Sequence, residues 1–229
     1  MRTTLGAQLS SSALAAIAVL LAWSTPALAQ ESVCGPLTSS YGPFDYRTQK
    51  KPLKVVEQYH FNANVENLVS GMTGSLEGDL DYVLATSPNH HRALMALARL
   101  SERPTFRPDR LRWRTPECYF DRAIRFAPND PVVYLMFAMF LSKQGKSDQA
   151  VRQLKQAETV TEFPLTHYNI GLVYFEMGRY EDALRQAQRA LAGGYTRTDL
   201  MEKLKAVGKW VDTGPATAAP DAAASKPTS

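Results

Sequence analysis

The chain has 229 residues, of which 45% are hydrophobic and 21% charged, and its formal net charge is +4 at pH 7. This length fits one domain with a continuous core, and so small a positive charge does not indicate a nucleic-acid partner.

Residues 1–29 have the features of a secretory signal peptide in the usual order. Arg2 supplies one positive charge, an apolar run follows over residues 13–23, and the small-residue triplet Ala27-Leu28-Ala29 precedes Gln30. The apolar run is about half the ~20 residues that span a bilayer. We therefore expect cleavage after Ala29, an exported protein that is periplasmic or secreted, and no membrane span after cleavage.

Residues 30–56 are expected to form an extended lead-in segment, because Gly and Pro recur there without a helical or alternating apolar pattern. This segment contains Cys34, and the second cysteine, Cys118, lies far downstream. In an exported protein such a pair favours a disulfide. The alternative is a buried Cys118 and an exposed free thiol at Cys34.

Further along, two consecutive segments repeat each other at a constant offset of 33 residues. The residues that match in class are Ala138 and Gly171, Leu141 and Tyr174, Gly145 and Gly178, Ala150 and Ala183, Leu154 and Ala187, and Ala157 and Ala190. Small residues let antiparallel helices approach closely, and the two glycines end the first helix of each pair. Because one hairpin cannot bury its apolar face alone, the pattern predicts stacked helical hairpins.

The second segment closely resembles the tetratricopeptide-repeat (TPR) family. The resemblance rests on His167-x2-Ile170-Gly171-x2-Tyr174, followed by Gly178, Tyr180, Ala183, Ala187 and Ala190, and the preceding segment fits through Tyr134-x2-Phe137-Ala138-x2-Leu141. Two positions depart from the family pattern: His167 replaces an aromatic residue and Ala187 a large one. The resemblance implies an all-α fold, a TPR-type helical-hairpin solenoid of three to four repeats with a C-terminal capping helix.

Sequence motifs typical of turns indicate that this solenoid extends over residues 57–211. Pro128-Asn129-Asp130 and Pro88-Asn89 read as inter-repeat turns, and Gly71 as the turn of a first, degenerate hairpin. The expected units are 57–90, 91–130 with an Arg-rich insertion, 131–163, 164–197 and a cap at 198–211. Residues 212–229, almost all Ala, Pro, Thr, Ser and Gly, are expected to be a disordered tail.

As the resemblance implies, a concave groove on the first helix of each hairpin binds a segment of a partner protein. The groove positions are Arg92, Met95, Arg99, Leu135, Met139, Lys143, Tyr168, Leu172 and Phe175. Such a groove is basic at one end and suits an acidic-hydrophobic segment, with Tyr168 and Phe175 as anchors. The alternative is that Leu135, Leu172 and Phe175 only pack against adjoining helices.

The Arg-rich insertion supports a second hypothesis, a receptor for an anionic envelope polymer (a glycan) or a lipid headgroup. Arginines beside aromatic rings suit anionic groups. The candidates are Arg103, Arg107, Arg110, Arg112, Trp113 and Arg114. The alternative is a solvated loop whose arginines pair with Glu102, Asp109, Glu117 and Asp121.

Neither a catalytic constellation nor a metal or cofactor motif is convincing. His90 and His91 are adjacent and point apart on a helix, and His167 occupies a packing position of the repeat, where a hydrogen-bonded histidine is expected. We therefore predict a non-catalytic protein-binding scaffold or adaptor of the cell envelope, without cofactor or metal. A variant of this hypothesis places the lead-in aromatics Tyr41, Phe44 and Tyr46 in the protein's own groove.

Overall fold

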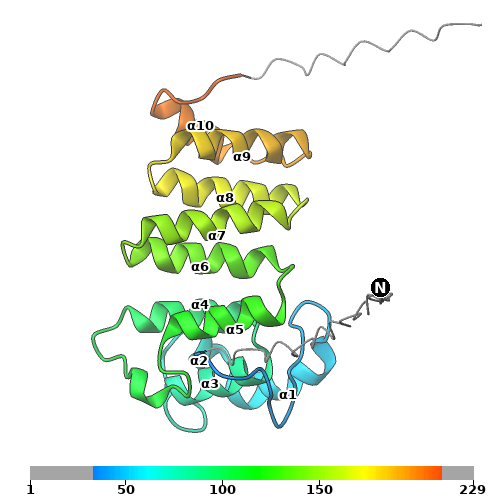
Figure 1. The fold of residues 1–229 in the computed structure, drawn as a ribbon, viewed down its shortest axis with the longest axis vertical. Helices are drawn as coiled ribbons and strands as arrows, with labels where there is room; N and C mark the ends of the chain where they lie inside the picture. The colour runs from blue at the N-terminus through cyan, green and yellow to red at the C-terminus, as the bar shows by residue number, and fades with distance from the viewer. Residues whose placement is uncertain (1–32, 213–229) are drawn as a thin grey trace, which may run out of the picture. The chain divides into compact units, whose positions relative to one another are not determined.

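Between residues 33 and 212, the part of the chain that the computed structural model describes, helices are joined by loops, and no strand is present in that range (Figure 1). The expected all-α fold is therefore confirmed. The predicted signal peptide at 1–29 lies outside the described residues, as does the predicted tail from residue 213 onward. No helix between residues 33 and 212 is long and apolar enough to cross a membrane.

The helices fall into a less regular first part and a regular second part. The first part contains α1 (Lys50–His60), α2 (Ala63–Glu66), α3 (Leu76–Thr86), α4 (His91–Ser101), the short 3-10 helix η1 (Pro108–Arg110) and α5 (Pro116–Phe126). The second part contains α6 (Pro131–Lys143), α7 (Ser147–Thr159), α8 (Pro164–Glu176), α9 (Tyr180–Ala192) and α10 (Asp199–Ala206).

Prolines and glycines set the ends of the regular helices. Pro131 and Pro164 stand in the first turns of α6 and α8, where the missing backbone N–H has no partner to lose. Gly145 and Gly178 follow these helices with φ values of +71° and +72°, which residues with a Cβ rarely adopt. Each glycine lets the next backbone N–H donate to a carbonyl of the last helical turn at 2.9 Å. The chain therefore reverses direction after each helix.

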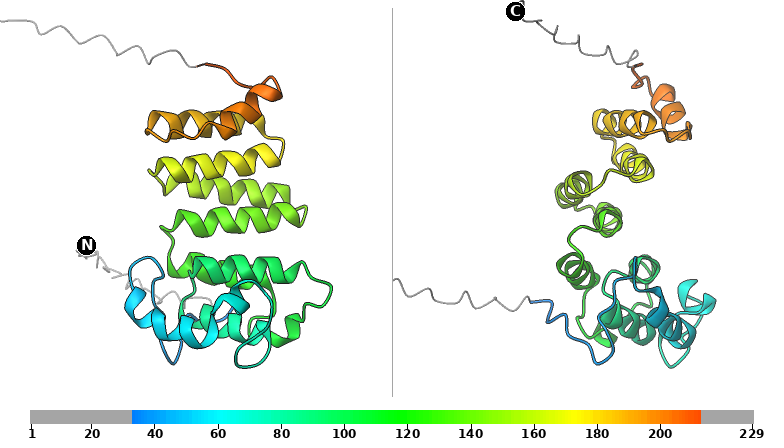
Figure 2. Two further views of the ribbon diagram at one scale, coloured as in Figure 1. Left: turned by 180° about the vertical axis from the view of Figure 1, so that it is seen from behind. Right: turned by 90° about the vertical axis from the view of Figure 1, so that its right-hand side faces the viewer.

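The right-hand view in Figure 2 looks along α6 to α9, which follow one another in a stack. Small residues let these helices pack closely. Ala138, Ala150 and Ala183 are completely buried. At Gly171 an added Cβ would lie 2.6 Å from Leu200 Cδ2 of α10 and 3.3 Å from the carbonyl oxygen of Ala183. The core therefore continues from the two hairpins into α10.

One predicted boundary is corrected in the first part of the chain. The extended lead-in segment was expected to reach residue 56, but α1 begins at Lys50. Leu53 and Val56 lie one helical turn apart and are buried. Three lysines and Pro52 surround this short apolar spacing, so it does not stand out in the sequence.

The lead-in segment is tied to the two inter-repeat turns. Asp130 is completely buried, and its carboxylate accepts hydrogen bonds from Asn89 Nδ2 at 3.0 Å and from His91 Nε2 at 2.8 Å. Asn89 Oδ1 in turn accepts from the backbone N–H of Tyr46 at 3.0 Å. The turns before α4 and α6 are therefore linked to each other and to the segment that precedes α1.

Candidate functional site

The nine predicted groove residues lie on α4, α6 and α8. Arg92, Arg99 and Lys143 are exposed, Met95, Met139, Leu172 and Phe175 are half-buried, and Leu135 and Tyr168 are buried. They therefore do not form one uniform surface.

The basic end of the predicted groove is occupied by α2 and the residues after it. Arg92 donates two hydrogen bonds to the Glu66 carboxylate, one from Nε at 2.7 Å and one from Nη2. Arg99 donates to the backbone carbonyl of Glu66 at 2.6 Å, and Arg103 to that of Leu68 at 2.8 Å. The expectation that Arg92 and Arg99 receive an acidic partner segment is corrected, because the chain's own residues 66–68 take that place.

Between α4 and α6 the groove is filled by side chains. Met95 and Met139 line a residual cleft of about 20 Å³, which holds little more than one water molecule. At its rim Lys143 pairs with Glu102 at 3.0 Å. This part of the predicted groove is therefore closed.

On α8 the two predicted anchors are covered to different extents by α10 and the loop before it. Tyr168 is 4% exposed, because its ring lies 4.9 Å from that of Tyr195 and its hydroxyl donates to Asp199 at 3.2 Å. Lys203 Nζ lies 5.6 Å from the centre of the Phe175 ring, which remains half-buried. Tyr168 therefore packs in the core at this end of the helical stack, whereas part of the Phe175 side chain remains exposed to solvent.

The start of α8 carries exposed apolar residues that the sequence analysis missed. Phe163 and Leu165 are 70% and 51% exposed. Leu165 precedes Leu172 by two helical turns, so both lie on the same side of α8. The predicted groove begins one turn later on this helix, at Tyr168. We call Leu165, Leu172 and Phe175 the α8 surface.

The Arg-rich insertion packs back onto α3. The backbone N–H of Arg107 donates to Glu77 Oε1 and that of Arg112 to Asp81 Oδ1, each at 3.3 Å. The Arg112 guanidinium also lies 3.7 Å from the Asp81 carboxylate. The insertion is therefore anchored by acidic residues of α3 that were not among its expected partners.

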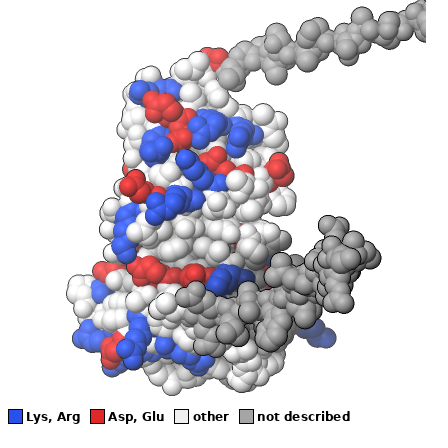
Figure 3. All heavy atoms as spheres, in the orientation of Figure 1, with Lys and Arg blue, Asp and Glu red and all other residues white. Residues whose placement is uncertain are grey.

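Three of the four partners expected for the insertion are engaged elsewhere: Glu102 pairs with Lys143, Glu117 with Lys146 and Asp121 with Arg125. Arg107, Arg110 and Arg114 are exposed. Figure 3 shows basic side chains at the level of the insertion and again at the level of α7 to α9, with acidic side chains between them. Basic charge is therefore not specific to the insertion, and the hypothesis of an anionic polymer receptor gains no support from its distribution.

A disulfide joins Cys34 to Cys118 and holds the lead-in segment against α5. Next to it, Gly35 lies so close to the Trp113 ring that an added Cβ would be 2.0 Å from it. Arg125 Nη2 donates to the carbonyl of Gly35 at 2.9 Å. Trp113, one of the candidate residues for an anionic ligand, is half-buried beneath this segment.

Arg122 lies beside Trp113 and was missed by the sequence analysis. Its side chain is completely buried, with the guanidinium carbon 4.2 Å from the centre of the Trp113 ring. Burial lowers the pKa of Arg122, and the nearby charges of Arg125 and Arg112 act in the same direction. No spacing or repeat pattern singles out one arginine of α5 among its neighbours.

The lead-in aromatics do not fill the predicted groove. Tyr41 and Phe44 contact each other with ring centres 5.0 Å apart, and the backbone N–H of Phe44 donates to the carbonyl of Thr86 at 2.9 Å. Tyr46 lies 4.2 Å from the His90 ring at the start of α4. The variant that places these residues in the groove is therefore wrong for Tyr41 and Phe44.

The histidines take part in structural hydrogen bonds. Pairs form between His60 and Asp79 (3.0 Å), His90 and Glu57 (3.0 Å), His91 and Asp130 (2.8 Å), and His167 and Gln186 (2.8 Å). Burial lowers the pKa of His90 to about 4, against the hydrogen bond to Glu57, which acts to raise it. Among residues 33–212 no group of three or more His, Cys, Asp and Glu side chains is placed to hold a metal ion.

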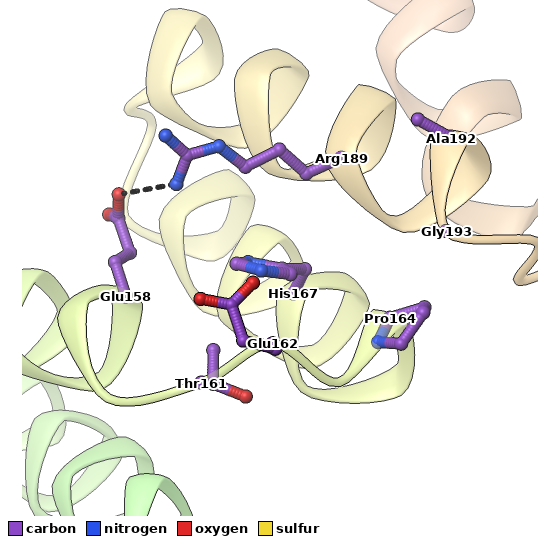
Figure 4. A pocket seen from close by; sticks show the side chains of 8 residues that line it. All are labelled: Glu158, Thr161, Glu162, Pro164, His167, Arg189, Ala192 and Gly193. Carbon is purple, nitrogen blue, oxygen red and sulfur yellow. Dashed lines mark ion pairs between the residues drawn. The ribbon is translucent and has the colours of Figure 1, made fainter.

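A cavity of about 450 Å³ opens where the ends of α7 and α9 meet the start of α8 (Figure 4). Glu158, Glu162, His167 and Arg189 line it. Arg189 lies 3.6 Å from Glu158, and the other oxygen of Glu158 accepts from the Tyr174 hydroxyl. Charges of both signs already pair here, so the cavity can admit a small polar molecule but has no dominant charge. Its walls come from three helices, which no linear motif reveals.

Two segments of the chain match tetratricopeptide repeat families, residues 119–152 and residues 164–192. The chain is also 28% identical, over 108 residues, to the "Small glutamine-rich tetratricopeptide repeat-containing protein 2" of Mycosarcoma maydis. That match covers 47% of this chain and about a third (31%) of the relative. Among solved structures, a thermophilic TPR protein of Thermus thermophilus aligns with 69% of this chain and 86% of its own, at a TM-score of 0.46 and 21% identity.

Proposed function

We propose that this chain is a non-catalytic protein-binding scaffold of the cell envelope, because two of its segments match tetratricopeptide repeat families, whose members generally mediate protein–protein contacts. It binds an apolar segment of a partner protein on the α8 surface. The α8 surface is favoured over the rest of the predicted groove, because residues 66–68 cover the α4 end and side chains fill the space between α4 and α6.

The observation that carries the proposal is the exposure of apolar side chains on the first helix of a repeat. Leu165 is 51% exposed and is followed on the same helix by the half-buried Leu172 and Phe175. Full burial of one such side chain contributes about 1.5 to 3 kcal/mol, so a few of them suffice for a specific contact. Lys203 beside Phe175 favours a carboxylate near the apolar residues of the partner.

Crosslinking tests the α8 surface directly. A photo-crosslinking residue at position 165 or 172, introduced in the native cells, is expected to capture one defined protein. Leu172→Glu should abolish capture from position 165. Leu191→Glu is the matched control, because Leu191 is 37% exposed on the neighbouring helix α9. Equal capture by both variants, or capture of many unrelated proteins, would argue against the α8 surface as the binding site.

The proposed location is the periplasm. It is supported by the signal-like residues 1–29 and by the Cys34–Cys118 disulfide, because such bonds persist in oxidising compartments. Mass spectrometry of the protein from its native cells is expected to show an N-terminus at Gln30. A chain that retains residues 1–29 would contradict export by signal cleavage without affecting the crosslinking result.

A further inference from the structure

Arg122 is a buried cation with an incomplete set of hydrogen bonds. Its Nη1 donates to the carbonyl of Pro36, but Nε and Nη2 are buried without a hydrogen-bond partner among the described residues. The same holds for the nearby Trp113 Nε1. A charged group buried with so few partners costs free energy that neutral carbonyl groups offset only in part. The Pro36 carbonyl and the Trp113 ring therefore leave two of the three guanidinium nitrogens unsatisfied.

The two unpaired nitrogens have the geometry that oxyanions recognise. Nε–H and one N–H of Nη2 point in the same direction along one edge of the planar guanidinium, so a carboxylate or phosphate accepts both in parallel. The neighbouring carboxylates already have arginine partners: Asp121 pairs with Arg125 at 2.8 Å and Asp81 lies 3.7 Å from Arg112. The surroundings of Arg122 therefore favour an additional anion.

The lead-in segment covers Arg122 and is fastened there by the disulfide. Cys118 and Arg122 are four residues apart on α5, so they lie on the same face of that helix. The disulfide brings residues 34–36 over this face, where the carbonyls of Gly35 and Pro36 accept from Arg125 and Arg122. Gly35 lies directly against Trp113, so no side chain could be added there without displacing the ring.

We propose that Arg122, Arg125 and Trp113 form an oxyanion-binding site that the lead-in segment covers while the Cys34–Cys118 disulfide is intact. A dithiol reductant opens it: two electrons and two protons convert the disulfide into two thiols, and the dithiol becomes a disulfide. Residues 33–36 then leave α5, and a carboxylate or phosphate group replaces their carbonyls on the arginines. The site is separate from the α8 surface, so the two proposals stand or fall independently.

Tryptophan fluorescence reports on this site. In the chain from residue 30 onward, Trp210→Phe leaves Trp113 as the single tryptophan. Inorganic phosphate and sodium acetate are titrated at constant ionic strength, with sodium chloride as the blank, before and after reduction by dithiothreitol. After reduction we expect emission at longer wavelength and a saturable response to the oxyanion, with at least a tenfold weaker response in the oxidised chain. The relative strength of the two probes distinguishes a phosphate group from a carboxylate.

Substitution of Arg122 separates ligand binding from stability. Arg122→Met should abolish the response of the reduced chain, whereas Arg114→Met, at an exposed arginine of the insertion, should keep it. In the oxidised chain Arg122→Met should leave the thermal midpoint unchanged or raise it, because a methionine leaves no buried charge. A large fall in that midpoint would identify Arg122 as a structural residue and overturn the proposal.

The proposal can still be tested if reduction of the disulfide unfolds the chain. If circular dichroism shows that the reduced chain loses helix, phosphate should raise its denaturation midpoint by mass action, and should do so only while Arg122 is present. The proposal is overturned if reduced wild type and Arg122→Met respond alike, if neither responds, or if the oxidised chain binds the probes as tightly as the reduced one.

Discussion

The two parts of the described chain are held together in different ways. From α6 to α9 the helices have equal lengths, and small residues such as Ala138 and Gly171 bring consecutive segments together. From α1 to α5, contacts join residues far apart in the chain, as between Asn89 and Asp130 or between Arg125 and Gly35. The second part therefore depends on packing between sequence neighbours, whereas the first part adds long-range polar bonds and one disulfide to its apolar core.

Removal of the disulfide should have the largest effect and should be confined to the first part. In the double variant Cys34→Ser/Cys118→Ser we expect the free energy of unfolding to fall by about 4 kcal/mol, because the bond closes a loop with a sequence separation of 84 residues. Urea denaturation measures the loss. Hydrogen exchange should show faster opening of α1 to α5 and little change in α6 to α9. An equal loss of protection in both parts would contradict the inference that the disulfide stabilises mainly the first part.

Asp130→Ala should have the next largest effect, because it leaves the buried Asn89 and the half-buried His91 without their shared acceptor. We expect a loss of about 3 kcal/mol, typical of a buried polar network with one member removed. Chemical denaturation measures this loss in the free energy of unfolding. Asp148→Ala, at an exposed position of α7, is the control and should change stability by less than about 0.5 kcal/mol.

A fall in pH should lower the free energy of unfolding of the first part, because His90 binds a proton more readily in the unfolded chain. Its pKa is lowered to about 4 in the folded chain, so between about pH 6.5 and pH 4 the unfolded chain binds the proton more tightly and stability falls as pH falls. Glu57 faces His90 and favours the proton, whereas Arg92 and Lys50 oppose it. Between pH 7 and pH 5 we expect a loss of about 2 kcal/mol from this group, after allowing for its ordinary pKa of about 6.5. Denaturation across this range should show a shallower slope for His90→Gln, and identical slopes would exclude His90 as the cause.

Gly171→Val tests the second part and should have the smallest effect of the four. The new side chain would displace Leu200 of α10, and overpacking of this kind costs about 1.5 kcal/mol. Hydrogen exchange should locate the change in α8 to α10. Gly74→Val is the matched control, since an added Cβ there meets nothing within 4 Å. A loss of protection in α1 to α5 would show that the two parts are more strongly coupled than we infer.

The same contrast explains what could be predicted from the sequence. The spacing around Gly145, Gly178 and the matched small residues is local, and it indicates the hairpins of α6 to α9 together with the hydrogen-bonded role of His167. The pairing of Arg92 with Glu66 is not local, since 26 residues separate the two. Nothing in a repeat pattern reveals such a partner, so the basic half of the predicted groove was expected to be free.

The candidate site was predictable only in part, for a related reason. Leu172 and Phe175 follow from the groove positions of the family that the sequence resembles, and they remain half-buried. Whether Tyr168 is open or covered depends on where α10 and Tyr195 pack, which the composition of α8 does not determine. Arg122 illustrates the same limit, because its surroundings come from the lead-in segment, whose Pro36 lies 86 residues upstream.

The disulfide also determines how the chain carries mechanical load. Residues 34–118 form a covalently closed ring that contains α1 to α4 and the insertion. A pull applied at residues 33 and 212 passes from Cys34 directly to Cys118, so the ring bears none of the tension. Force would therefore unfold α6 to α10 and the remainder of α5, whereas the helices within the ring would not be under tension.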